Sequence, residues 1–324
     1  MTINFKIAPK LTPTAQFSSL CRWLLFGLFA LTNASCSHAI NKTDNSHSPH
    51  QGFITYSEIN EASGIIHSAH QDNLFWVLND SGNQPILYAI NGHGEFLGKV
   101  VIEGVKNIDW EDIALYEKQE ESYLVIADVG DNRAQRSKLY LHFVKEPNRS
   151  QLSPNKLIRS KPAWSQTFNY PEGPRDCESL TIDSQENKAL LLTKRDKPPV
   201  LYELDLSSSS HHAKRLGTIQ PLPEQPIVKD LRSIKNLIFA RQPTAMDISA
   251  DGKQLAVLTY TNAYLYSLSK PYKWSELIRL QPTEIELPYL SQGEALSFDR
   301  SGKQLVITTE GLPAPIITLD LGKR

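Results

Sequence analysis

Cysteine is scarce in this chain, with three residues among 324. Two of them, Cys21 and Cys36, fall in or directly after an N-terminal apolar segment. Only Cys177 remains in the rest of the chain, so an intrachain disulfide framework is excluded there. We interpret Cys177 as a small buried residue rather than a nucleophile, because free cysteine is usually buried.

An excess of charge of either sign is also missing. Lys and Arg number 34 and Asp and Glu number 35, which argues against a general nucleic-acid binder. The chain has no nucleophile elbow, no zinc signature and no phosphate-binding loop. No common motif therefore marks it as an enzyme.

Long hydrophobic runs are missing too, and the apolar run at 23–31 (WLLFGLFAL) is too short to span a bilayer. It follows Lys6, Lys10 and Arg22, as the core of a signal peptide does. We predict a signal peptide over residues 1–35. The end of this segment resembles a bacterial lipoprotein cleavage site with Cys36 as the lipid-bearing residue, and plain secretion is the alternative. We expect an exported protein, periplasmic or anchored to the outer membrane.

Residues 36–51 are polar and are predicted to be a flexible tether, followed by a single domain over 52–324. This domain lacks any long stretch of helical periodicity. Short apolar runs alternate with Gly, Pro, Asp and Asn, a pattern that predicts an all-β fold.

The chain carries an internal repeat. TAMDISADGKQLAVLTY, which begins at 244, matches EALSFDRSGKQLVITTE, which begins at 294. The same template extends upstream, and each unit has room for four strands. The predicted units begin at Glu61, Glu111, Glu178, Thr244 and Glu294.

Radially arranged four-stranded units predict a β-propeller. We expect five blades, with the strand at 52–59 completing the last blade and so removing an exposed sheet edge. Six blades is the alternative, with the extra one near residues 235–243.

The first strand of a propeller blade is innermost, so the five unit-start residues are expected to meet at one mouth of the central channel. Four carboxylates and a hydroxyl would repel one another there unless a cation joined them. Oxygen ligands favour Ca²⁺, and the lack of His and Cys disfavours zinc. The alternative is that these groups hydrogen-bond backbone amides around a water-filled channel.

The loops expected on the same face are rich in Arg and Asp, which suits a phosphate or another oxyanion. Ion pairs that brace the loops are the alternative. If the protein is an enzyme, the general base would be Asp80, Asp128 or Asp131. Developing charge would then be stabilised by Arg133, Arg136 or Arg175.

Several stretches, among them LNDSGN, NIDWEDIA, ADVGDNRAQR and RDCESLTID, resemble a bacterial group of exported propellers labelled phytase-like or esterase-like. The layout is also similar to the calcium-activated nucleotidases (apyrases), five-bladed propellers with Ca²⁺ in the axial tunnel. That family places Glu at the start of the inner strand in four blades and Ser in the fourth blade, where Thr244 stands here.

Two hypotheses follow. One is a calcium-binding propeller that binds an anionic small molecule or a partner without catalysis. The other is a Ca²⁺-dependent hydrolase of phosphoesters or phosphoanhydrides, as the resemblances imply. We expect a monomer, a membrane attachment through Cys36 and no nucleic-acid partner.

Overall fold

A computed structural model describes residues 50–208, 211–219, 241–269, 271–288, 290 and 292–322. The predicted signal peptide, Cys36 and almost all of the tether lie outside the described residues, as does most of the segment 235–243. The described residues belong to one compact unit, His47–Arg324. None of the helices in this described part is long and apolar enough to cross a membrane.

The described strands form five separate sheets, each containing four strands in antiparallel order. The first sheet contains β2 (Ala62–His67), β3 (Phe75–Asn79), β4 (Ile86–Ile90) and β5 (Phe96–Ile102), and the second contains β6 (Trp110–Lys118), β7 (Glu121–Asp128), β8 (Leu139–Lys145) and β10 (Trp164–Phe168). The third contains β11 (Cys177–Asp183), β12 (Lys188–Thr193), β13 (Val200–Asp205) and β14 (Lys214–Thr218), and the fourth contains β15 (Pro243–Ile248), β16 (Gln254–Thr259), β17 (Asn262–Ser267) and β18 (Thr283–Glu286). The fifth contains β19 (Gly293–Phe298), β20 (Gln304–Thr309), β21 (Ala314–Asp320) and β1 (His50–Ile54). We number these sheets as blades 1 to 5.

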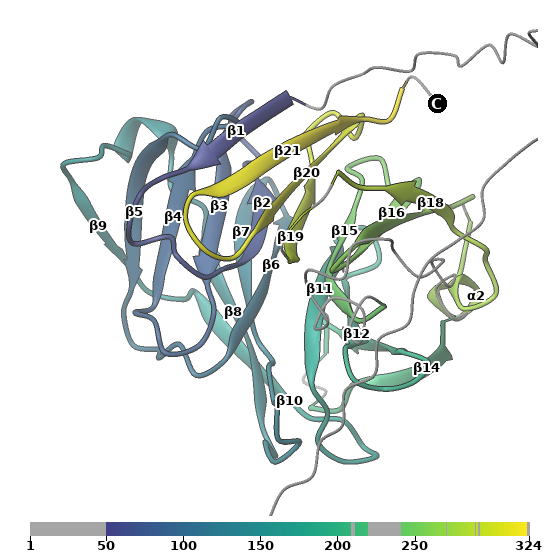
Figure 1. Ribbon diagram of the computed structural model, residues 1–324. Helices are drawn as coiled ribbons and strands as arrows, with labels where there is room; N and C mark the ends of the chain where they lie inside the picture. The colour runs from purple at the N-terminus through teal and green to yellow at the C-terminus, as the bar shows by residue number, and fades with distance from the viewer. Residues whose placement is uncertain are drawn as a thin grey trace, which may run out of the picture. The chain divides into compact units, whose positions relative to one another are not determined.

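The first strands of the five blades contact one another in a closed cycle: β2 with β6, β6 with β11, β11 with β15, β15 with β19, and β19 with β2 (Figure 1). The prediction of an all-β, five-bladed propeller is therefore confirmed. The six-bladed alternative is wrong, because the inner strands close the ring with five members.

The N-terminal strand β1 completes blade 5 by pairing antiparallel with β21, with Ile54 opposite Ala314 (Figure 1). This confirms the predicted closure, although the strand spans His50–Ile54 and turns before residue 59. Pairing β21 with a strand from the other end of the domain covers an edge that would otherwise invite association with other chains.

The core is divided among the five interfaces between neighbouring blades. Each interface holds its own cluster of buried aliphatic and aromatic side chains. Second strands such as β3 and β16 are buried on both faces, because a blade is stacked on each side of them. This explains why they read as continuous apolar runs in the sequence.

Three smaller elements lie outside the four-strand plan. Strand β9 (Leu157–Ser160) adds to β5 in parallel and makes blade 1 five-stranded. It belongs to the insertion between β8 and β10, which also holds the 3₁₀ helix η1 (Arg149–Gln151). The short helix α2 (Trp274–Leu277) precedes β18, and its Trp274 donates Nε1–H to Asp183 of blade 3 at 3.1 Å.

Candidate functional site

A β-bulge begins the first strand of every blade. The pairing register between the first and second strands skips one residue at the same place in each sheet. A bulge leaves one residue unpaired and re-aims its side chain. The five bulged residues, which we call the bulge ring, are Ser63, Glu111, Glu178, Thr244 and Glu294.

This register corrects the predicted repeat in blade 1. The equivalent of Glu111 is Ser63, two residues after the predicted Glu61. Glu61 is exposed and its carboxylate accepts an N–H from Asn83 at 2.6 Å. The offset arose because the repeat was aligned on a glutamate, whereas Ser63 occupies the bulge in blade 1.

The two hydroxyls of the bulge ring lock neighbouring blades together. Ser63 Oγ donates to the carbonyl of Trp110 at 3.0 Å, and Thr244 Oγ1 donates to the carbonyl of Gly293 at 2.7 Å. In each case the acceptor directly precedes the bulged glutamate of the next blade. The hydroxyls therefore hold the inner strands in place and position the neighbouring carboxylates.

Three bulge-ring glutamates remain, and all three are buried: Glu111, Glu178 and Glu294 are 5–6 % exposed. Burial, followed by the charge of Glu178, raises the pKa of Glu111 well above its usual range. Burial also raises the pKa of Glu178 to about 7, against the opposing effect of Lys194. Taken from water in this way, the carboxylates strongly favour any cation placed among them.

A second ring of side chains follows directly after the second strand of each blade: Asp80, Val129, Lys194, Tyr260 and Glu310. Lys194 is the one basic side chain in this ring. Its ammonium forms an ion pair with Glu178 and lies 5.1 Å from the ring centre of Tyr260. Burial by itself would lower the pKa of Lys194, but the negative charges of Glu178 and Glu294 act in the opposite direction and raise this pKa overall.

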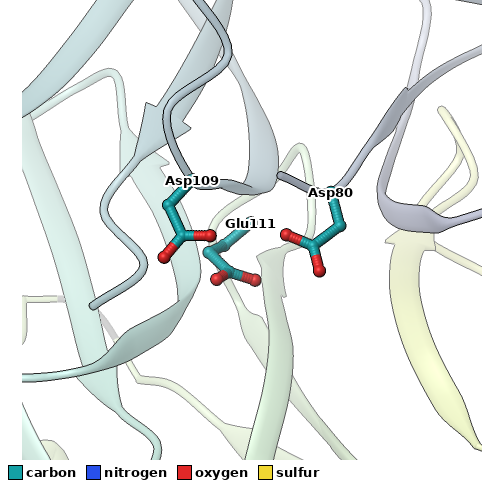
Figure 2. A group of neighbouring side chains, drawn as sticks. All are labelled: Asp80, Asp109 and Glu111. Carbon is teal, nitrogen blue, oxygen red and sulfur yellow. The ribbon is translucent and has the colours of Figure 1, made fainter. Parts of the chain in front are cut away.

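Beside this ion pair the mouth also holds Asp80, Asp109 and Glu111, which offer oxygens within 4.8 Å of one another. Figure 2 shows their three carboxylates turned toward a shared space. Burial and then the charge of Asp80 raise the pKa of Asp109 to about 6. A second group, Glu111 with Asp176 and Glu178, meets the same distance limit, so Glu111 belongs to both.

The carboxylate of Glu111 accepts no hydrogen bond from any described residue. The backbone approaches it closely at Gly130, where a Cβ would collide with Oε1 of Glu111 and with the Asp109 carboxyl group. A buried carboxylate without a donor is costly, because burial removes its water without replacing it. Glu111 is thus a buried carboxylate at the mouth to which no described residue donates a hydrogen bond.

The remaining predicted site residues are engaged in loop contacts. Asp128 pairs with Arg136 at 2.6 Å, and the two carboxylate oxygens of Asp131 accept the backbone N–H groups of Gln135 and Arg136 at 2.8 and 2.7 Å. Arg175 pairs with Asp196 at 2.7 Å. These contacts match the bracing role that was left open as the alternative.

Asp80 and Arg133 differ from that group. Asp80 belongs to the carboxylate cluster, where burial raises its pKa, and Arg133 is exposed on the loop between β7 and β8. Cys177 is fully buried, as expected, and burial raises its pKa to about 12. This thiol is therefore not a nucleophile near neutral pH.

Asp109 and Asp176 were not among the residues predicted from the sequence to bind a cation. Each stands two residues before a bulged glutamate, in the repeated pattern Asp-x-Glu (DWE and DCE). Lys194 was not singled out either, and the register places it at the position of Asp80 and Glu310. Aligning the ends of the second strands would have shown both features.

The chain is similar in fold to a solved β-propeller, the major Malassezia sympodialis allergen Mala s 1. The TM-score is 0.50 and the identity 12 %, over 85 % of this chain and 97 % of that one. At this identity the similarity shows the fold alone. No family model and no curated protein matches the chain.

Proposed function

We propose that this protein is a calcium-binding β-propeller whose channel mouth holds the ion and whose surrounding loops bind an anionic ligand or partner without catalysis. The observation that carries the proposal is the buried Glu111 carboxylate, which lacks a hydrogen-bond donor and is shared by two groups of carboxylates. A cation would replace the water that burial removes from it.

The donor set suits Ca²⁺. The side chains of the group offer carboxylate oxygens, the type that Ca²⁺ prefers, and water would complete the shell of the ion. Three oxygens at most 4.8 Å apart can all lie about 2.8 Å from a shared point, close to the 2.3–2.6 Å of Ca²⁺–oxygen bonds. The resemblance to propellers with an axial Ca²⁺ agrees with this choice.

Calorimetric titration of the purified protein with CaCl₂ tests the proposal, with MgCl₂ as the comparison ion. We expect saturable Ca²⁺ binding and a rise in melting temperature. Glu111→Gln should abolish both effects. A matched control is Glu95→Gln, on the opposite side of blade 1 between β4 and β5, which should bind Ca²⁺ as the original chain does. Absence of binding by the folded protein would refute the function.

The alternative is a Ca²⁺-dependent phosphohydrolase. It retains Asp80 as a base and Arg133 as an oxyanion partner, since the other predicted catalytic residues take part in loop contacts. Phosphate release from nucleotides, phytate and p-nitrophenyl phosphate, with and without calcium, distinguishes the two functions. Release that Asp80→Asn abolishes would favour the enzyme.

We also propose export and lipid attachment at Cys36, on the strength of the N-terminal sequence pattern. Metabolic labelling with a radioactive fatty acid tests this proposal. Label should enter the chain and be lost in Cys36→Ser. Equal labelling of the two proteins would contradict attachment at this residue.

A further inference from the structure

We propose that the channel mouth is built for two cations in different halves. The ammonium of Lys194 permanently occupies the half around Glu178 and Glu294, and an exchangeable divalent ion binds off the axis between Asp80, Asp109 and Glu111. This inference rests on the proposed function and specifies its ligands and capacity.

The first half of the mouth is already compensated. Lys194 is 7 % exposed at its side chain and forms its ion pair with Glu178, while Glu294 adds to the attraction. Glu294 also accepts a hydrogen bond from Gln292 at 3.0 Å. A divalent ion centred between these two glutamates would be repelled by the ammonium that lies beside them.

The second half is compensated only at longer range, by Lys194 near Asp80 and Glu111 and by Arg136 near Asp109. No described lysine or arginine forms an ion pair with Asp80, Asp109 or Glu111, and Glu111 is nine-tenths buried without a donor. Arg136 pairs with Asp128 and Arg195 contacts Asp176 at 2.6 Å, so neither arginine forms an ion pair with these three carboxylates. Figure 2 shows the three carboxylates turned toward one another.

Backbone contacts hold this second half in position. Asp80 donates its N–H to the carbonyl of Glu61 at 2.9 Å, and the carbonyl of Asp109 accepts N–H groups from Val129 and Gly130, both at 3.1 Å. Gly130 leaves the space that a Cβ would fill against Glu111. Ligands held by the ends of three strands need little reorganisation when an ion arrives, which favours tight binding.

The test compares two substitutions of the same kind on opposite sides of Lys194, made in the full chain. Asp109→Asn should lower Ca²⁺ affinity about tenfold or more, as loss of a ligand does. Glu294→Gln should change it less than about threefold. Terbium provides a second readout, because Trp110 is adjacent to Glu111 and should sensitise Tb³⁺ luminescence. That signal should vanish in Asp109→Asn and persist in Glu294→Gln.

Lys194→Met tests the other half of the proposal. Removing the ammonium should raise the calorimetric stoichiometry from one ion per chain to two, whereas Lys194→Arg should keep one. Urea unfolding checks that each variant is folded before titration. If the two Lys194 variants do not fold, the comparison of Asp109→Asn with Glu294→Gln still tests the off-axis site.

The failures can be told apart. If the original chain binds no ion, the proposed function itself fails. If it binds an ion but Glu294→Gln weakens binding as much as Asp109→Asn, the ion lies on the axis and the off-axis site is wrong. If folded Lys194→Met keeps one ion with unchanged affinity, Lys194 does not act as a resident cation.

Discussion

The carboxylate of Asp112 on β6 accepts the backbone N–H of Leu180 on β11 at 2.8 Å, across the boundary between blades 2 and 3. The same oxygen lies 3.4 Å from the backbone nitrogen of Met246 on β15, which donates to it. One buried side chain thus joins the inner strands of three blades. Asp247 does the same for blades 4 and 5, accepting the N–H of Phe298 at 2.8 Å.

Asp112→Ala is expected to lower the free energy of unfolding by about 2–4 kcal/mol, because the backbone N–H groups of Ile113, Leu180 and Met246 lose this acceptor. Chemical unfolding in urea measures the loss. Asp72→Ala is the control, since that side chain is 84 % exposed and should change stability by less than about 0.5 kcal/mol. Equal stabilities of the two variants would show that Asp112 does not brace the channel.

Lys194→Met should destabilise the ion-free protein by about 3–5 kcal/mol, the cost of leaving a buried partner charge uncompensated. Adding Glu178→Gln to it should recover part of the loss, because the orphaned carboxylate is then removed. A double-mutant cycle in urea, without metal, measures this coupling. Strict additivity of the two substitutions would contradict a direct ion pair at the mouth.

Stability is expected to depend on pH through Asp247. Burial raises its pKa to about 6, against the opposing effects of His67 and of backbone hydrogen bonds. The folded state therefore binds more protons than the unfolded state, so this group's contribution falls as pH rises from about 4 to about 6. Unfolding free energies measured across this range should fall less steeply in Asp247→Asn. Identical slopes would show that Asp247 titrates normally.

Arg136→Gln separates a brace from a catalytic role. It leaves the fully buried Asp128 without its ion pair, so stability should fall by about 1–3 kcal/mol. Ca²⁺ affinity measured by calorimetry should stay within about threefold of the original value. A large change in ion binding with unchanged stability would place Arg136 in the binding site instead.

Ring closure can be tested at Gly52 on β1. Its backbone lies against the carbonyl of His93, which also accepts the N–H of Phe53 at 3.1 Å. A methyl group there would collide with that carbonyl, so Gly52→Ala should cost about 1–3 kcal/mol. Ser57→Ala, on the exposed turn after β1, is the control. Unchanged urea unfolding of Gly52→Ala would mean that β1 contributes little to closure.

The sequence by itself determined the fold. Each blade is a meander of strands that are neighbours in the chain, so a repeated local pattern is enough to reveal it. Counting strands also showed that the segment before the first repeat must complete the last blade. The convergence of Glu111, Glu178 and Glu294 could be anticipated because equivalent positions of stacked blades share one face.

Only the tertiary structure decided the composition of the channel mouth. The pairing of β2 with β3 sets the bulge position in blade 1, and Ser63 stands there in place of the predicted Glu61. The ammonium of Lys194 meets Glu178 within its own blade, but its approach to Glu294 depends on a blade two places away. Side-chain contacts between blades depend on the closed ring as a whole, and a linear pattern carries no record of them.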